Sequence, residues 1–138
     1  MKNRSMTVFG AALLLLATVS VDAFGDAGNY SLLASMVGKF EGIIQVENAK
    51  PVGHKYQTEI VSVDLPANTV SLTAVCNDCG IKKWARTSCE IREKKERIRF
   101  TCRGPKSDED YSYDGKALTA TGFGNKYPYS INVTKLTQ

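Results

Sequence analysis

The chain has 138 residues, of which 43% are hydrophobic and 23% charged, a composition typical of globular proteins and unlike that of disordered or fibrous chains. Its formal net charge of +4 is a mild excess that by itself identifies no partner. The sequence contains no internal repeat and no low-complexity segment, so a single globular domain is expected.

The first 23 residues have the pattern of a secretory signal peptide. Lys2 and Arg4 precede the apolar run 8–21, and a small-residue cleavage site ends at Ala23. The apolar run is too short to cross a bilayer as a helix, which needs about 20 residues. Residues 1–23 are therefore expected to be removed, leaving a secreted or periplasmic protein without a membrane span.

The remaining residues, 24–138, are predicted to form one all-β domain. Only the segment 29–37 has a helical pattern, and Gly38 ends it. Downstream, alternating apolar and polar residues separated by turn residues predict about eight antiparallel strands. These strands are expected at 40–47, 55–65, 69–76, 83–92, 97–103, 110–113, 116–122 and 129–136.

Short connections between sequential strands favour a meander that closes into a barrel, since closure removes the exposed sheet edges. A two-sheet β-sandwich is the alternative. The helix followed by Gly38-Lys39-Phe40 resembles the calycin superfamily of lipocalin-like barrels, in which a short helix leads into a strand opening with Gly-x-Trp. Phe40 stands where that family usually has Trp. The resemblance implies a barrel enclosing a cavity and carries over no ligand residue.

The four cysteines predict two disulfides. An even number of cysteines in a small exported chain favours disulfides over zinc, and the later pair lacks the spacing of a zinc ribbon. A turn centred on Lys95-Glu96 places Cys89 opposite Cys102, within reach of a disulfide. Cys76 and Cys79 would then close a small loop, with a bond between Cys76 and Cys89 as the alternative.

Catalytic and metal-binding patterns are weak. His54 is the single histidine and is interpreted as a residue of an exposed loop, without an identifiable catalytic partner. The run Asp108-Glu109-Asp110 lacks the spacing of a calcium loop and is interpreted as a solvated turn. The protein is accordingly predicted not to be an enzyme, with no catalytic residue, metal or cofactor.

Basic residues gather on the predicted hairpin 82–103, which carries nine basic and three acidic residues. In the register above, Arg92 stands opposite Arg99, an unfavourable pair unless glutamates or an anionic partner relieve it. The export signal argues against nucleic acid, so an extracellular protein or an anionic surface is the expected partner. The candidate partner-binding residues on the outer face are Trp84, Arg86, Arg92, Arg97, Arg99 and Arg103.

Two functions follow from this pattern. The favoured one is a monomeric binding protein that holds a small apolar ligand inside the barrel. The alternative is a protein-binding module, such as an inhibitor of a secreted hydrolase, acting through its loops or through hairpin 82–103. Tyr111, Tyr113, Tyr127 and Tyr129 are interpreted as ordinary strand residues, with a place at the barrel mouth as the alternative. The residues expected to line the cavity are Phe40, Ile44, Leu72, Ile98, Phe100 and Ile131.

Overall fold

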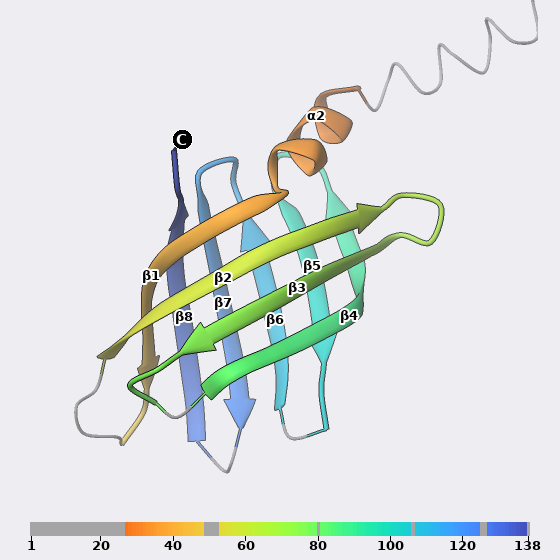
Figure 1. Cartoon of the computed structure of the whole chain (residues 1–138). Helices are drawn as coiled ribbons and strands as arrows, with labels where there is room; N and C mark the ends of the chain where they lie inside the picture. Colours follow the sequence, from red (N-terminus) through yellow and green to blue (C-terminus); the bar gives the residue numbers. More distant parts are fainter. Residues whose placement is uncertain (1–26, 49–52, 80, 106, 125–126, 138) are drawn as a thin grey trace, which may run out of the picture.

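The computed structural model describes residues 27–48, 53–79, 81–105, 107–124 and 127–137. The predicted signal peptide lies outside the described residues. Eight strands follow one another around a closed barrel in chain order, each antiparallel to its neighbours, and the first pairs with the last (Figure 1). The predicted meander barrel is confirmed, and the alternative sandwich is wrong.

Each predicted element is present; 69–76 has the predicted boundaries, and the boundaries of the others are shifted by a few residues. The largest difference is at the sixth strand, which begins three residues earlier than expected. The elements are α2 (Ala27–Ser35), β1 (Gly38–Val46), β2 (Gly53–Asp64), β3 (Thr69–Cys76), β4 (Ile81–Lys94), β5 (Ile98–Arg103), β6 (Ser107–Tyr113), β7 (Ala117–Gly124) and β8 (Tyr127–Lys135).

Large side chains fill the middle of the barrel. Alternate residues of strands such as β3 and β5 point inward, as the period of two in an extended chain requires. Phe100 stacks on Tyr111 with ring centroids 4.8 Å apart, and Phe40 meets Tyr113 edge-on at 5.9 Å. These aromatic pairs make the centre a packed core, as is common in barrels of this size.

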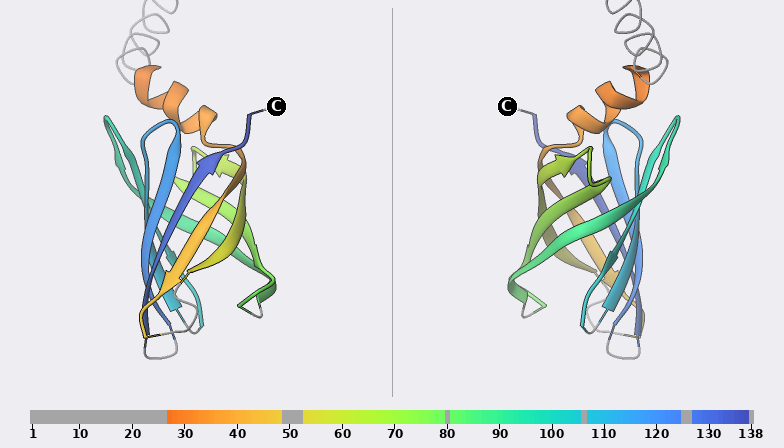
Figure 2. Two further views of the ribbon diagram at one scale, coloured as in Figure 1. Left: turned by 90° about the vertical axis from the view of Figure 1, so that its left-hand side faces the viewer. Right: turned by 90° about the vertical axis from the view of Figure 1, so that its right-hand side faces the viewer.

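Helix α2 covers one end of the barrel (Figure 2). Leu33 of the helix and Met36, which follows the helix, are buried in the core. The carbonyl oxygen of Ser35 accepts hydrogen bonds from the Tyr113 hydroxyl, at 3.1 Å, and from the Lys135 ammonium group. The end of the helix is thus fixed to β6 and β8. Within the described ranges, no helix is long and apolar enough to cross a membrane.

The barrel closes where β1 meets β8, and this contact requires a glycine. Gly42 pairs with Val133, and a Cβ atom added at Gly42 would overlap the backbone carbonyl oxygen of Asn132. Backbone atoms cannot move aside as a flexible side chain can. The absence of a side chain at position 42 therefore allows the two strands to approach closely enough to pair.

We expect Gly42→Ala to lower the free energy of unfolding by about 2 to 3 kcal/mol, because the added methyl group forces the paired backbones apart. Urea denaturation measures the effect. Gly53→Ala is the matched control, since the nearest atom to its added Cβ belongs to the Ile43 side chain at 3.2 Å. Equal losses in the two variants would contradict the argument.

Both predicted disulfides are present, Cys76–Cys79 and Cys89–Cys102, and the alternative bond between Cys76 and Cys89 is wrong. Such bonds are typical of proteins in oxidising compartments.

The predicted register of the β4–β5 hairpin holds only in part. Ile91 lies opposite Phe100 as expected, but a bulge follows and brings Glu93 opposite Arg99. The predicted pairing of Arg92 with Arg99 is therefore wrong. Arg92 instead forms an ion pair with Glu90 at 3.5 Å, so the hairpin avoids the unfavourable contact of like charges.

Candidate functional site

A second bulge, at Thr87 and Ser88, reverses which side chains in the first half of β4 point into the barrel. Ser88 has a φ of 60°, and both residues of the bulge face solvent opposite a single residue of β3. The extra residue inverts the alternation of side chains before it. Trp84 and Arg86 consequently point into the barrel, and the prediction that they lie on its outer face is wrong.

The acidic segment of β6 is also placed differently from the prediction. Asp108, Glu109 and Asp110 belong to a strand and not to a solvated turn. Glu109 shares the inward face with Tyr111 and Tyr113 and is 1% exposed, whereas its two acidic neighbours are exposed. The barrel therefore contains a buried carboxylate.

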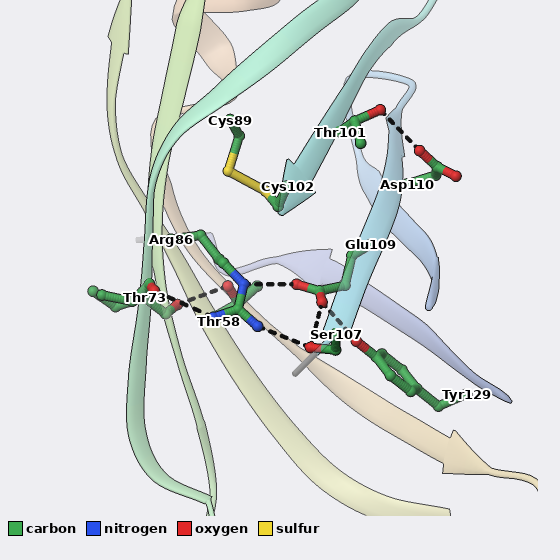
Figure 3. Close-up of a disulfide and its surroundings, with 11 residues drawn as sticks. Thr58, Thr73, Arg86, Cys89, Thr101, Cys102, Ser107, Glu109, Asp110 and Tyr129 are labelled. Carbon is green, nitrogen blue, oxygen red and sulfur yellow. Dashed lines mark hydrogen bonds and ion pairs between the residues drawn. A yellow bond between two sulfur atoms is a disulfide. The ribbon is translucent and has the colours of Figure 1, made fainter. Parts of the chain in front are cut away.

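Arg86 and Glu109 meet inside the barrel and form a buried ion pair (Figure 3). The Arg86 Nε donates to Glu109 Oε1 at 3.3 Å, and the side chains are 10% and 0% exposed. Ser107 bridges the pair, since its Oγ accepts from Arg86 Nη2 and donates to Glu109 Oε2, both at 2.9 Å. The Tyr129 hydroxyl donates to the same Oε2 at 2.7 Å. Three donors thus engage the carboxylate.

Trp84 and Gly104 both lie close to the guanidinium group of Arg86. Its Cζ lies 3.8 Å from the centroid of the Trp84 ring, within the range of a cation–π interaction. A Cβ atom added at Gly104 would lie 2.5 Å from the same Cζ, so only glycine leaves room for the group there. These contacts fix the orientation of Arg86 toward Glu109.

Three polar atoms next to this ion pair are buried without a hydrogen-bond partner among the residues described. They are the hydroxyl oxygens of Tyr56 and Tyr111 and the indole nitrogen of Trp84, which lie near one another. Burial, together with the negative charge of Glu109, raises the pKa of Tyr56 above its ordinary value. Burial also raises the pKa of Tyr111, with a further contribution from the neighbouring Tyr56. Both phenols therefore stay protonated in the fold.

A cavity of about 420 Å³ opens at the end of the barrel opposite α2, and we call it the mouth cavity. Its volume lies within the usual range for small-molecule sites, roughly 300 to 1,000 Å³. Arg86 and Ser107 line its polar part. The larger, apolar part is lined by Ile44, Val46, Trp84, Pro105, Tyr127 and Tyr129.

The six residues expected to line a ligand cavity all point into the barrel and are buried. Ile44 also lines the mouth cavity. Phe40 and Phe100 take part in the aromatic pairs of the packed core. The mouth cavity thus lies at one end of the barrel and not at its packed centre, and contact of these six residues with a ligand stays a prediction.

The other residues singled out in the sequence lie in two groups. Four of the predicted partner-binding arginines are exposed on β4, β5 and their connection: Arg92, Arg97, Arg99 and Arg103. Tyr127 and Tyr129 line the mouth cavity, whereas Tyr111 and Tyr113 belong to the core. His54 lies in β2 opposite Ile44 and is half-buried, so its interpretation as an exposed loop residue is wrong.

Sequence reasoning missed Tyr56, Ser107 and Glu109 as parts of the site. Alternation extended backward from Tyr113 and Tyr111 would have placed Glu109 on the inward face. The signal for the bulge was Trp84. A regular strand with Cys89 and Ile91 in the core exposes this large aromatic side chain, and one extra residue between them turns it inward.

Fold and site together define a small closed barrel with a packed centre, one end covered by a helix and a largely apolar cavity at the other. Comparison with protein-family models, with curated proteins and with solved structures finds no match for this chain.

Proposed function

We propose that the protein binds a small, largely apolar molecule in the mouth cavity of its barrel. The observation that carries this proposal is the cavity itself, about 420 Å³ in volume and lined mainly by aliphatic and aromatic side chains around one charged group, Arg86. Sites for small molecules typically combine an apolar lining with a few fixed polar groups. The role is binding and transport or storage, without catalysis, in a secreted or periplasmic protein.

The construction of the polar part of the cavity supports a binding role. Arg86 is fixed by Glu109, Ser107 and the Trp84 ring before any ligand arrives. A side chain that is already ordered loses little conformational entropy on binding, which favours affinity. Most of the ion pair is shielded from water, so this arrangement is more than an exposed surface contact.

The alternative function, binding of a protein through the basic hairpin, depended on Trp84 as an aromatic anchor. Trp84 and Arg86 instead belong to the mouth cavity. The outward face of the hairpin keeps its arginines, one of which is paired with Glu90. Exposed charges commonly serve solubility, so the cavity is the better-supported site.

A tryptophan at position 46 tests the proposal. Val46 is partly buried at the end of β1 and lines the mouth cavity, so we expect Val46→Trp to fill it without disturbing the packed core. Native mass spectrometry of protein purified from its own host should show a small molecule released from the wild type on denaturation. The Val46→Trp variant should be at least tenfold depleted in that molecule.

Ile43→Trp is the matched control, because Ile43 is the outward-facing residue of the same strand and is 51% exposed. This variant should release the same molecule in the same amount as the wild type. Equal release from Val46→Trp would contradict the proposed function, and so would the absence of any released molecule together with the absence of binding of a small apolar probe.

A further inference from the structure

The ion pair at the mouth cavity has hydrogen-bond donors left over but no free acceptor, and this difference restricts the chemistry of a ligand. A carboxylate accepts hydrogen bonds and a guanidinium group donates five. Both oxygens of Glu109 are occupied, one by Arg86 and the other by Ser107 and Tyr129. Glu109 is also fully buried, so it offers a ligand no acceptor.

Arg86 retains unused donors. Its Nε donates to Glu109, its Nη2 to Ser107 and its Nη1 to the Ala85 carbonyl at 3.4 Å, which leaves two of the five N–H bonds. The Arg86 side chain keeps 10% of its surface exposed and lines the mouth cavity. A ligand in the cavity would therefore meet hydrogen-bond donors on a fixed group.

Glu109 offsets the charge of Arg86, so the ion pair itself has no net charge. Of the described residues that line the cavity, only Arg86 is charged. An anionic ligand would place a second negative charge near Glu109, and these described lining residues supply no further cation to balance it, which is costly beside a buried ion pair. A cationic ligand would meet Arg86 and, among the same residues, no free carboxylate.

We propose that the ligand is a neutral, largely apolar molecule carrying a hydrogen-bond acceptor, such as the carbonyl of a ketone, ester or amide, and that Arg86 donates to this acceptor. The inference rests on the proposed function and names the ligand class of the same cavity. Tyr129 and Trp84 supply aromatic surface beside the acceptor site. Glu109 sets the specificity by cancelling the charge that would otherwise select an acid.

Three naphthalene derivatives of similar size test this assignment: methyl naphthyl ketone, ethylnaphthalene and naphthoate. Trp84 is the single tryptophan of the chain and lines the cavity, so quenching of its fluorescence reports binding. We expect the ketone to bind about tenfold more tightly than the hydrocarbon, which lacks the acceptor, and about tenfold more tightly than the carboxylate. The Val46→Trp variant, read by calorimetry, should bind none of them.

Two variants locate the source of the preference. Glu109→Gln removes the compensating charge, so naphthoate should now bind at least as tightly as the ketone. The double variant Arg86→Met/Glu109→Leu removes donor and charge together, and the ketone and hydrocarbon should bind equally. The second variant keeps the test valid if the unpaired arginine of the first prevents folding.

The outcomes separate the inference from the function on which it rests. Naphthoate or ethylnaphthalene binding the wild type as tightly as the ketone, with Val46→Trp abolishing all binding, overturns the inference and leaves the proposed function standing. A ligand released from the native protein that carries a carboxylate, phosphate or ammonium group has the same meaning. Absence of any released molecule, together with absence of probe binding, overturns both.

Discussion

Replacing Arg86 with methionine should lower the free energy of unfolding by about 3 to 5 kcal/mol, the typical cost of removing one partner of a buried ion pair. Glu109 has no exposed side-chain surface and would keep its place between Ser107 and Tyr129 without a balancing charge. Urea denaturation at neutral pH measures the loss. Arg99→Met is the matched control, because Arg99 is exposed on β5 and should cost less than about 0.5 kcal/mol.

The double variant Arg86→Met/Glu109→Leu should recover most of that stability and lie within about 1 to 2 kcal/mol of the wild type. Replacing both members of a buried pair by apolar residues removes the desolvation cost of both charges. The residual loss comes from Ser107 and Tyr129, whose hydroxyls would lack their acceptor. Additive losses from the two single substitutions would show that the ions do not depend on each other.

Recovery in the double variant would also bear on why the pair is present. If apolar residues can replace Arg86 and Glu109 at little cost, stability does not require these two charges. That result would support the proposal that the fixed guanidinium group at the mouth of the barrel serves a ligand. Urea denaturation and the ligand series of this double variant therefore test what the Arg86–Glu109 ion pair does for stability and for ligand preference.

The alternation of apolar and polar residues was sufficient to predict the barrel. Segment 69–76 was predicted with its observed boundaries as β3, because alternate residues from Val70 to Cys76 are buried and no bulge interrupts the segment. The pairing of Cys89 with Cys102 was predicted from a register that places the apolar residues Ile91 and Phe100 opposite each other. That register holds beyond the bulge but is one residue off next to the turn.

The site was missed because it depends on irregularities. A bulge adds one residue to a strand and reverses which side chains face inward, so a register extended through Ser88 places Trp84 and Arg86 on the wrong face. Glu109 was assigned to solvent because charged residues are usually exposed. It is instead buried together with its ion-pair partner Arg86, which lies 23 residues away in the chain. Such long-range pairs have no signature in local periodicity.

Three tyrosines lead to the second large effect, which depends on pH. Burial raises the pKa of Tyr56, Tyr111 and Tyr129 above the ordinary value of about 10, to which all three return on unfolding. Below that value the folded and unfolded states both hold the phenolic protons, so these groups contribute no pH dependence to the free energy of unfolding. Above it the unfolded chain loses protons that the folded chain keeps, so stability falls as pH rises.

Each of these phenols should lower the free energy of unfolding by about 1.4 kcal/mol per pH unit above pH 10, or about 4 kcal/mol per pH unit for all three. Urea denaturation across alkaline pH measures the slope, and the tyrosinate absorbance that is lost in Tyr111→Phe should appear together with unfolding. Tyr111→Phe should reduce the slope by about a third. It should cost little at neutral pH, because the lost hydroxyl has no hydrogen-bond partner among the described residues. Tyrosinate absorbance that appears in the folded wild type near pH 10 and is missing from folded Tyr111→Phe would mean that the barrel admits water to Tyr111.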